Sequence, residues 1–366
     1  MSFSFGFTST DFSDDELDGE IQQGQSQVGS TIQSSHPLDA AHLSCKDVVQ
    51  PLWENLEAMI KSLENVRISF EEFRTPQNNT VLYRRELFDV KHQLMSEADE
   101  GNDEKVELDI LIGETSEDLR KNVYEGGLKS WECSIDVVDS LSVSDAQLKN
   151  VDCVLELGCG TALPTEYIFS RYLKEQSKSG CKFILSDYNN SVLRLVTIPN
   201  LIITWAKTIL SDEQWIQLQQ SGNEDIPIRT DELLLTAGFL EAFYQDIKER
   251  NISIDVISGT WGRCFSNLIP ARLDTGKEIL IISSETIYQP ENLPVVAETI
   301  LEVILSKQPG NVKAIVAAKD IYFGVGGSIM EFEKYLKKRI ANAALPITYS
   351  TYKVDSGLKR SIISIQ

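Results

Sequence analysis

The chain has 366 residues, which is enough for one large domain or two small ones. Its apolar fraction of 42% and charged fraction of 24% are ordinary for a soluble protein, and we identify no apolar run long enough to cross a membrane. The formal net charge of −21 argues against direct binding to nucleic-acid phosphates and favours a basic partner, although acidity that maintains solubility is the simpler explanation on its own.

Cysteine and histidine usage indicates the compartment and the cofactor class. Six cysteines without paired metal-ligand spacing favour a reduced intracellular protein over a disulfide framework. The three histidines, His36, His42 and His92, all precede the predicted catalytic region, so we predict no metal site. The opening run Met1–Phe5 has neither a basic region nor a hydrophobic run, so no signal peptide is predicted.

Residues 1–45 are predicted to form a disordered acidic segment. They are rich in Ser, Gln, Asp and Glu, and the first basic residue of the chain is Lys46. Such a composition buries too little apolar surface to offset the entropy lost on ordering. Four phenylalanines in this segment suit either a docking motif for a partner or a dispensable tail: Phe3, Phe5, Phe7 and Phe12.

Residues 46–145 are predicted to form an N-terminal cap on the main domain. Pro51–Lys61 carries apolar side chains on one face of a short helix. Val66–Phe73 and Val81–Leu94 are typical of extended segments. The acidic, glycine-containing stretch Ser96–Lys105 is typical of an exposed loop.

The segment Tyr124–Cys133 combines a double glycine, a tryptophan and several polar side chains, and a helical pattern follows it at residues 135–141. We expect this segment to close over a cofactor from the N-terminal side. Simple core packing is the alternative for Trp131, and periodicity alone favours it. The residues expected to contact the cofactor here are Ser130, Trp131, Glu132 and Cys133.

The run Val154–Pro164, VLELGCGTALP, is the most informative feature of the chain. Strand-forming residues end in an acid-x-Gly-x-Gly turn that opens a helical pattern, as in the first βα unit of a nucleotide-binding sheet. Leu163 replaces the third glycine of the dinucleotide motif. Glu156 would repel a pyrophosphate, but it can hold the ammonium group of S-adenosylmethionine (SAM), which carries no phosphate. The motif therefore predicts SAM as the cofactor, with contacts from Glu156, Gly158, Cys159 and Gly160.

From residue 146 to the end, strand and helix patterns alternate, which predicts the catalytic domain. Strands are predicted at Val151–Leu157, Lys182–Ser186, Ile252–Ser258, Glu278–Ser283, Val312–Lys319, Pro346–Val354 and Arg360–Ile365. The middle strands are continuous apolar runs, as expected for parallel strands covered on both faces, and the turn Asp355–Gly357 predicts a final antiparallel hairpin. We therefore predict an α/β fold: the seven-stranded, Rossmann-like doubly wound sheet of class I SAM-dependent methyltransferases. Asn189–Asn251 is expected to hold at least two helices.

Two further strand ends carry side chains that suit a cofactor. Asp187 ends the second predicted strand, where an acid can accept hydrogen bonds from both ribose hydroxyls. Trp261 follows the third strand between two glycines and is expected to pack against the adenine, with a core position as the alternative. The cofactor contacts predicted at the second to fourth strand ends are Asp187, Asn189, Ser258, Gly259, Trp261 and Ser284.

The fourth strand end carries the predicted catalytic groups. Glu285 and Tyr288 are three residues apart in a turn and are expected to point into the cleft, where they orient an acceptor nitrogen. A helix N-terminal cap is the alternative for Glu285. Asn189 is equally suited to hold the acceptor, and the sequence gives no basis for choosing between it and Glu285. The predicted catalytic residues are therefore Glu285, Tyr288 and Asn189.

The run Gly324–Ser328 follows the fifth predicted strand. It lacks P-loop spacing and a following Lys-Ser/Thr, which argues against a nucleoside triphosphatase. We expect its backbone to line an acceptor channel, with Ser328 capping the next helix.

The chain resembles the fungal histidine protein methyltransferases through five motifs: Tyr124–Cys133, Glu156–Pro164, Ser186–Asn189, Ser258–Gly262 and Ser284–Tyr288. The opening run Ser2–Phe7 is also similar to that group. The resemblance covers nearly the whole chain and is weakest at residues 15–45. Related protein methyltransferases carry Asp-x-x-Tyr after the fourth strand, whereas this chain has Glu285-Thr286-Ile287-Tyr288.

The resemblance implies transfer of one methyl group from SAM to a histidine ring nitrogen of a basic substrate, large-subunit ribosomal protein L-three. It also implies cytoplasmic and nuclear locations and a role in ribosome biogenesis and translation. The charge and the lack of a long apolar run predict no direct nucleic-acid or membrane binding. Two alternatives stay open. A protein lysine or a small molecule can be the acceptor, with Tyr288, Tyr322 and Phe323 around an amine, or the chain is a non-catalytic assembly factor with a methyltransferase fold.

Overall fold

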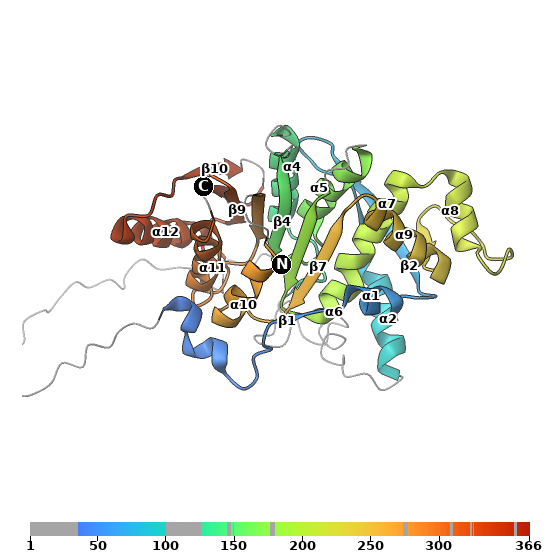
Figure 1. Ribbon diagram of the computed structural model, residues 1–366, viewed down its shortest axis with the longest axis horizontal. Coiled ribbons are helices and arrows are strands. Elements are labelled where there is room, and N and C mark those ends of the chain that lie inside the picture. Colours follow the sequence, from blue (N-terminus) through green and yellow to red (C-terminus); the bar gives the residue numbers. More distant parts are fainter. Residues whose placement is uncertain are drawn as a thin grey trace, which may run out of the picture. The chain divides into compact units, whose positions relative to one another are not determined.

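The computed structural model describes residues 36–99, 126–144, 148, 150–175, 180–273, 277–307, 310–322, 324, 326–354 and 357–366. Residues His36–Gln366 form one compact unit. Its centre, within the described residues, is an eight-stranded sheet with the order β1-β7-β5-β4-β8-β9-β11-β10 (Figure 1). The strands are β1 (Leu52–Trp53), β4 (Val151–Leu157), β5 (Lys182–Asp187), β7 (Ser253–Ser258), β8 (Glu278–Ser284), β9 (Val312–Lys319), β10 (Tyr349–Val354) and β11 (Arg360–Ile365).

The parallel strands of the main sheet all end at the same edge. Strands β4, β5, β7, β8 and β9 run parallel, so their carboxyl ends meet there. Strand β11 is antiparallel to both β9 and β10, which confirms the predicted reversed last strand and hairpin. The chain runs from β4 to β5 and β7 on one side and then to β8 and β9 on the other. Ligands of doubly wound sheets bind at the carboxyl edge beside such a switch in strand order.

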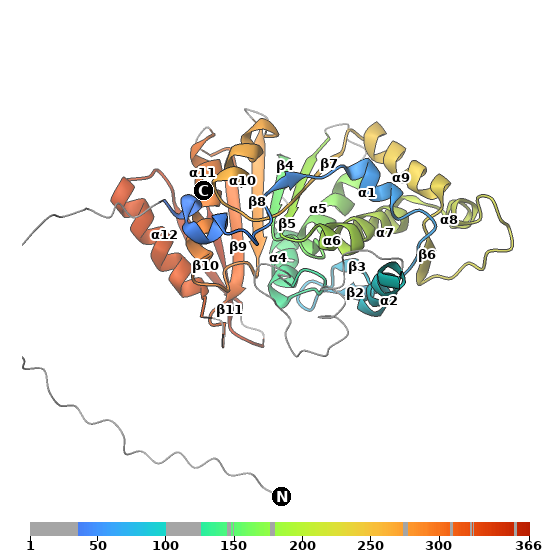
Figure 2. The ribbon, with the colours of Figure 1, turned by 90° about the horizontal axis from the view of Figure 1, so that it is seen from below.

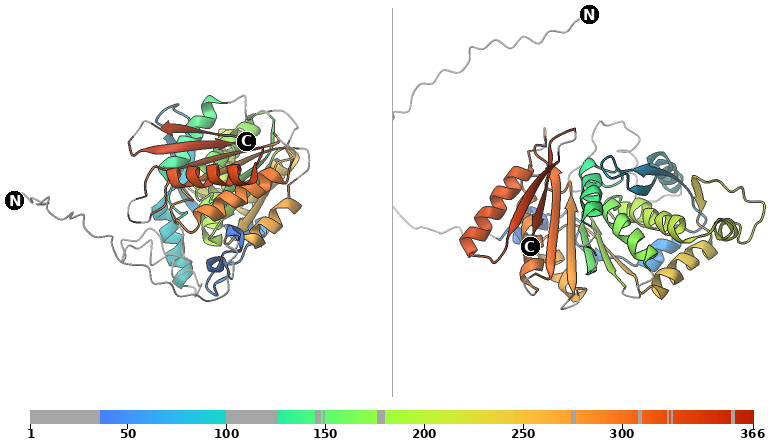
Figure 3. Two further views of the ribbon diagram at one scale, coloured as in Figure 1. Left: turned by 90° about the vertical axis from the view of Figure 1, so that its left-hand side faces the viewer. Right: turned by 90° about the horizontal axis from the view of Figure 1, so that it is seen from above.

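Helices cover both faces of this sheet (Figures 2 and 3). One face carries α4 (Glu132–Val143), α5 (Leu163–Lys174), α7 (Ile198–Ile209) and α9 (Ala237–Glu249), and the other carries α10 (Arg263–Leu268), α11 (Leu293–Leu305) and α12 (Ile329–Ala343). Alternate residues of β5 enter the two cores: Phe183 and Leu185 pack in the first, and Ile184 packs in the second. This alternation follows from the pleat of the strand, and double coverage explains the continuous apolar runs of the sequence.

A smaller sheet, with the order β3-β2-β6 in the described residues, connects the N-terminal region to the long interval between β5 and β7. Its strands are β2 (Arg67–Arg74), β3 (Val81–Arg85) and β6 (Glu232–Leu234), and the nearby helices are α1 (Leu56–Lys61), α2 (Leu87–Asp99), α6 (Asn190–Val192) and α8 (Asp212–Gln219). The interval thus holds the two or more helices that were predicted. The domain boundary predicted at residue 145 stays a prediction.

Two predictions for the N-terminal region are wrong in detail. The helix predicted from Pro51 starts later, because Leu52–Trp53 forms β1 against β7 and the side chain of Asn55 caps α1 by accepting a hydrogen bond from Ala58 N. The extended segment predicted as far as Leu94 stops at β3, and helix α2 follows. In this helix Val90 and Leu94 lie one turn apart and are both buried.

The exposed loop predicted at Ser96–Lys105 overlaps α2, which continues to Asp99, and its other residues lie outside the described ones. The segment 1–45 was predicted to be disordered, yet Pro37–Asp39 and Ala41–Ser44 form two 3-10 turns. They do so because Leu38 and Leu43 bury apolar surface against Val295 of α11. The four N-terminal phenylalanines lie outside the described residues.

The helical stretch Asn190–Ile209 has the length and apolar composition of a membrane-crossing helix, with a mean hydropathy of 1.3, although we identified no such stretch in the sequence. In the folded protein 78% of it is buried. Its side chains, including Trp205 against Phe239 and Phe243, belong to the core on one face of the main sheet. The stretch is therefore a core helix of this fold.

Candidate active site

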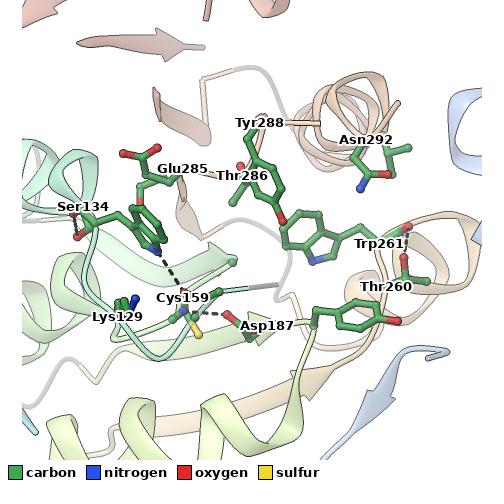
Figure 4. Close-up of a pocket in the computed structure, with 18 of the residues that line it drawn as sticks. Lys129, Ser134, Cys159, Asp187, Thr260, Trp261, Glu285, Thr286, Tyr288 and Asn292 are labelled. Atoms are coloured by element: carbon green, nitrogen blue, oxygen red, sulfur yellow. Dashed lines mark hydrogen bonds between the residues drawn. The ribbon is translucent and has the colours of Figure 1, made fainter. Parts of the chain in front are cut away.

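A cavity lies at the carboxyl ends of β4, β5, β7 and β8, beside the switch in strand order (Figure 4). It encloses about 1020 Å³ of space, including open solvent at its mouth. Nine of the predicted site residues line it: Trp131, Gly158, Cys159, Gly160, Asp187, Trp261, Ser284, Glu285 and Tyr288. Lining residues that the sequence did not indicate as site residues include Lys129, Ser134, Thr161, Tyr188, Thr260, Thr286, Glu291, Asn292 and Val295.

The glycine turn after β4 forms one wall of the cavity. Gly158 has a φ of +67°, and a Cβ there would lie 2.5 Å from Cγ2 of Thr286 in the loop after β8. Gly160 has a φ of +51°, and a Cβ there would lie 3.1 Å from the carbonyl oxygen of Gly127. Backbone conformation therefore favours glycine at both positions, and space requires it at Gly158. The turn brings backbone from three separate segments close together around the cavity.

Asp187, at the end of β5, is fixed by the same turn. Its Oδ2 accepts a hydrogen bond from Gly160 N at 2.9 Å, and its Oδ1 accepts one from Asn189 N at 3.3 Å. Figure 4 shows Asp187 and Cys159 on one side of the cavity, with Glu285, Thr286 and Tyr288 on the other. An acid placed at the second strand end suits the ribose hydroxyls of a nucleoside-bearing cofactor.

Trp261 lines the cavity beyond the end of β7. Its indole Nε1 donates a hydrogen bond to Oγ of Ser186 at 3.0 Å, which fixes the ring plane. A Cβ on Gly158 would lie 3.3 Å from this ring, so the glycine turn and the indole are in direct contact. An aromatic face beside the glycine turn is suited to an adenine base.

Ser258 and Gly259, predicted to contact the cofactor, do not line the cavity. The Ser258 hydroxyl donates to Glu54 Oε1 at 2.5 Å. Gly259 has a φ of +101°, and a Cβ there would lie 2.6 Å from the carbonyl oxygen of Gln50. Both residues therefore face the N-terminal region of the chain.

Glu156 also lies outside the cavity wall. Its side chain is fully buried, and its Oε2 accepts hydrogen bonds from the backbone N–H and the hydroxyl of Thr165 at 3.2 and 2.5 Å. Its Oε1 has no hydrogen-bond partner among the described residues. Burial, together with the charge of Asp187, raises the pKa of Glu156 to about 8, against the lowering effect of Thr165. The structure therefore places Glu156 behind the glycine turn, outside the cavity lining, and its contact with a ligand's ammonium group stays a prediction.

Glu285 is the most constrained residue of the cavity wall. It adopts a φ of +58°, which is rare for a residue with a side chain. Its side chain is only 7% exposed, Oε2 accepts a hydrogen bond from the Tyr322 hydroxyl at 2.6 Å, and Oε1 lies 3.9 Å from Nζ of Lys319. Oε1 is buried and has no hydrogen-bond partner in the described part of the chain. The predicted alternative, a helix N-terminal cap, is wrong, because α11 begins at Leu293.

Tyr288 lies on the same loop and packs edge-to-face on Tyr322, with 6.3 Å between the ring centroids. Its carbonyl oxygen accepts a hydrogen bond from Gly327 N at 2.8 Å. This bond ties the loop after β8 to the glycine-rich run after β9. The Ser328 hydroxyl caps α12 by accepting a hydrogen bond from Glu331 N, as predicted.

The segment before α4 closes the cavity from the N-terminal side, where Gly126, Gly127, Lys129 and Trp131 line it. Three residues of this segment that were predicted to contact the cofactor do not line the cavity. Ser130 hydrogen-bonds Thr161, Glu132 pairs with Lys319 at 3.3 Å, and Cys133 is fully buried beside Glu285. Asn189 does not line the cavity either, since it stands at the N-terminus of α6.

A segment that we call the strap, residues 36–50, completes the wall with His42, Leu43 and Val48. It is bound by hydrogen bonds from Thr260 N to the Val49 carbonyl at 2.9 Å and from Val49 N to the Tyr188 hydroxyl at 3.2 Å. Arg263 pairs with Asp39 at 3.1 Å. Sequence reasoning missed the strap because its anchors lie more than a hundred residues away along the chain.

The cavity has the features that SAM requires. The glycine turn leaves room for a ligand against backbone, Asp187 presents a carboxylate, and Trp261 presents an aromatic face. The carboxylates of Asp187 and Glu285 also suit a cationic ligand. Among the described residues, no group of three or more His, Cys, Asp or Glu side chains is arranged to hold a metal ion.

Comparison with known proteins places the chain in a family, although no family model matches it. Histidine protein methyltransferase 1 of Saccharomyces cerevisiae is 57% identical over 372 residues, which cover 100% of this chain and 98% of that protein. The protein of the same name from Schizosaccharomyces pombe is 36% identical over 277 residues, 75% of each chain. Among solved structures, a SAM-dependent methyltransferase from Agrobacterium tumefaciens matches with 10% identity and a TM-score of 0.36, over 64% of this chain and 62% of that chain.

The doubly wound sheet with its reversed last strand, the glycine turn and the acid at the next strand end are those of a SAM-dependent methyltransferase. SAM is therefore its methyl donor. Given the identity to the two yeast proteins, the chain belongs to the histidine protein methyltransferase family.

Proposed function

We propose that this protein transfers one methyl group from SAM to a ring nitrogen of a histidine in large-subunit ribosomal protein L-three. The names of the family members give histidine as the acceptor residue. One structural observation supports the proposed chemistry. That observation is the Glu285 carboxylate in the cavity wall, with Oε2 bonded to Tyr322 and Oε1 buried without a hydrogen bond from any described residue.

The cofactor would be held by the glycine turn and its neighbours. Asp187 would bind the ribose hydroxyls, Trp261 would pack on the adenine, and the backbone at Gly158 would allow close approach. When bound, SAM supplies an electrophilic methyl group on a sulfonium sulfur. The protein contributes mainly by aligning the acceptor nitrogen with this group, and alignment alone can account for several kcal/mol of the barrier.

A histidine acceptor fits the groups of this wall. A neutral imidazole carries a lone pair at cytoplasmic pH, so attack requires no strong base. It requires an acceptor for the N–H of the other ring nitrogen, which fixes the tautomer and stabilises the positive charge that develops on the ring. Oε1 of Glu285 is suited to accept that N–H. Asn189 was the other candidate, and its absence from the cavity wall favours Glu285. Tyr288 would orient the ring by packing.

The lysine alternative has less support. A lysine must lose a proton with a pKa near 10.4 before it attacks, whereas a neutral imidazole already carries a lone pair. Tyr322, one of the aromatics expected around an amine, instead binds Glu285 through its hydroxyl and does not line the cavity. A non-catalytic role has less support still, because the glycine turn, Asp187 and the cavity are all present.

The proposed substrate and location rest on the net charge of the chain and on its family. Ribosomal proteins are basic, and a net charge of −21 favours encounter with them while disfavouring nucleic acid and anionic membranes. The proposal includes action in the cytoplasm and nucleus, in connection with ribosome biogenesis and translation.

The test is transfer of labelled methyl groups from SAM to ribosomal proteins of a strain that lacks this enzyme. The labelled protein would be identified and then hydrolysed, and the methylated amino acid would be determined by mass spectrometry. Methylhistidine in protein L-three is expected. Methylhistidine in another protein would overturn the substrate, and methyllysine would overturn the acceptor.

A further inference from the structure

The hydroxyl of Tyr322 donates a hydrogen bond to Oε2 of the Glu285 carboxylate at 2.6 Å. We propose that Tyr322 is a positioning residue for methyl transfer: it fixes Glu285 so that Oε1 of the carboxylate faces the acceptor ring. The inference rests on the proposed function of Glu285 and adds a residue that neither the sequence motifs nor the cavity lining indicates.

The Tyr322 hydroxyl accepts one hydrogen bond and donates another. Its oxygen accepts a hydrogen bond from the backbone N–H of Lys319 at 3.3 Å, so the hydroxyl proton is free to point at Oε2 of Glu285, 2.6 Å away. Burial, followed by the charge of Glu285, raises the pKa of Tyr322 well above its usual range, so the hydroxyl stays a donor at every physiological pH. A fixed donor on Oε2 holds the plane of the carboxylate.

The other described groups around the Glu285 carboxylate leave Oε1 without a hydrogen-bond donor. Nζ of Lys319 lies 3.9 Å from Oε1, where it favours the anion electrostatically but is too far away to be a hydrogen-bond donor. Lys319 is occupied by Glu132 at 3.3 Å and lies over the ring of Trp131. The Cys133 thiol lies beside the carboxylate from α4, and burial and Glu285 raise its pKa, so it stays neutral. Oε1 is therefore a buried acceptor that no described residue uses.

The glycine-rich run after β9 explains how Tyr322 reaches Glu285. A Cβ on Gly327 would lie 2.1 Å from the carbonyl oxygen of Ile287, so only glycine lets this run pack backbone to backbone on the loop that carries Glu285. Gly327 also accepts a hydrogen bond from Tyr322 N at 3.2 Å through its carbonyl oxygen. The run thus anchors Tyr322 against the loop of Glu285, a role more specific than lining a channel.

The experiment compares Tyr322→Phe with Tyr335→Phe in the full-length protein. Tyr335 is a matched control, because its hydroxyl donates to the Glu298 carboxylate at 2.7 Å and neither residue lines the cavity. We expect Tyr322→Phe to lower kcat by about 10- to 100-fold, because a misplaced group costs on the order of 100-fold. SAM affinity, KM for the protein substrate and the unfolding temperature should stay close to the wild-type values. Tyr335→Phe should leave kcat unchanged.

A double-mutant cycle separates positioning from a general structural effect. If Tyr322 acts through Glu285, then Tyr322→Phe should have little further effect in a Glu285→Gln background. An equal loss of kcat in both backgrounds would overturn the inference, as would a wild-type kcat in Tyr322→Phe. Retained SAM affinity shows that each variant is folded. If the wild-type product is methyllysine, the proposed function fails, and the cycle measured on that product still decides whether Tyr322 acts through Glu285.

Discussion

The backbone N–H of Gly160 donates a hydrogen bond to Oδ2 of Asp187 at 2.9 Å. This contact connects the glycine turn after β4 to the acid at the end of β5. Two motifs that are 27 residues apart in sequence therefore form one structural unit. The unit both shapes the turn and fixes a carboxylate that lines the cavity.

Asp187→Ala should weaken SAM binding by at least about tenfold, because it removes the ribose acceptor and leaves Gly160 N without its partner. Isothermal titration calorimetry with SAM measures the effect. Asp246→Ala is a suitable control, since Asp246 accepts hydrogen bonds from Trp205 and Arg250 away from the cavity. Equal SAM affinity in the Asp187 variant and the wild type would show that Asp187 does not hold the cofactor.

SAM should protect the strap from proteolysis, because His42 and Val48 line the cavity and would be held by the ligand. Trypsin cleavage after the exposed Lys46 should slow when SAM is added, while cleavage after Arg229, in an exposed loop elsewhere, should not change. Leu38→Ala should speed cleavage after Lys46 and weaken SAM binding, since Leu38 packs the strap against Val295. Protection at both sites alike would indicate general stabilisation instead.

Affinity for the basic protein substrate should fall as salt rises. The Debye length shrinks from about 10 Å at 0.1 M to about 3 Å at 1 M, which screens the attraction to a chain of net charge −21. The measurement is KM for ribosomal protein across a salt series, with SAM affinity as the internal reference. A KM independent of salt would leave the acidic surface without a role in substrate encounter.

Glu166→Gln should stabilise the protein at neutral and alkaline pH. Burial raises the pKa of Glu166 from 4.5 to about 8, and Oε1 accepts a hydrogen bond from Tyr83 N at 2.6 Å. Between these two pH values the unfolded chain releases a proton that the folded protein keeps, so the free energy of unfolding falls as pH rises. Glutamine avoids this loss and can donate to the nearby Thr204 hydroxyl.

The gain from Glu166→Gln should be about 2 kcal/mol at pH 8.5 and should shrink as pH falls towards 5, given about 1.4 kcal/mol per pKa unit and an imperfect amide replacement. Urea denaturation of both proteins across that range tests this. A gain that is the same at every pH would mean that proton release from Glu166 is not its cause.

The predictions from the sequence were correct where a local physical constraint allows few residue types. Ile279–Ile282 is continuously apolar because β8 is covered on both faces, and Gly158 and Gly160 are glycines because their φ values are positive. Asp187 followed from its place at a strand end. These local constraints were enough to predict the sheet, its reversed last strand and the position of the cofactor cavity.

Sequence reasoning failed where the partner of a side chain is fixed only by the folded structure. Glu156 has the residue type that suits an ammonium group, but Thr165 takes one of its oxygens and burial keeps it from the cavity. The strap contacts the cavity through residues more than a hundred positions away, such as Tyr188. Tyr322 reaches Glu285 across 37 residues and through a glycine contact that only the folded chain shows.

The most direct test of the central claim compares the wild type with Glu285→Gln on purified ribosomal protein L-three. Turnover, SAM affinity and the identity of the methylated amino acid are measured on the same samples. We expect methylhistidine from the wild type, and a kcat lower by about 10- to 1000-fold in Glu285→Gln with SAM affinity nearly unchanged. Equal turnover by the two proteins, or methyllysine as the product, would contradict this expectation.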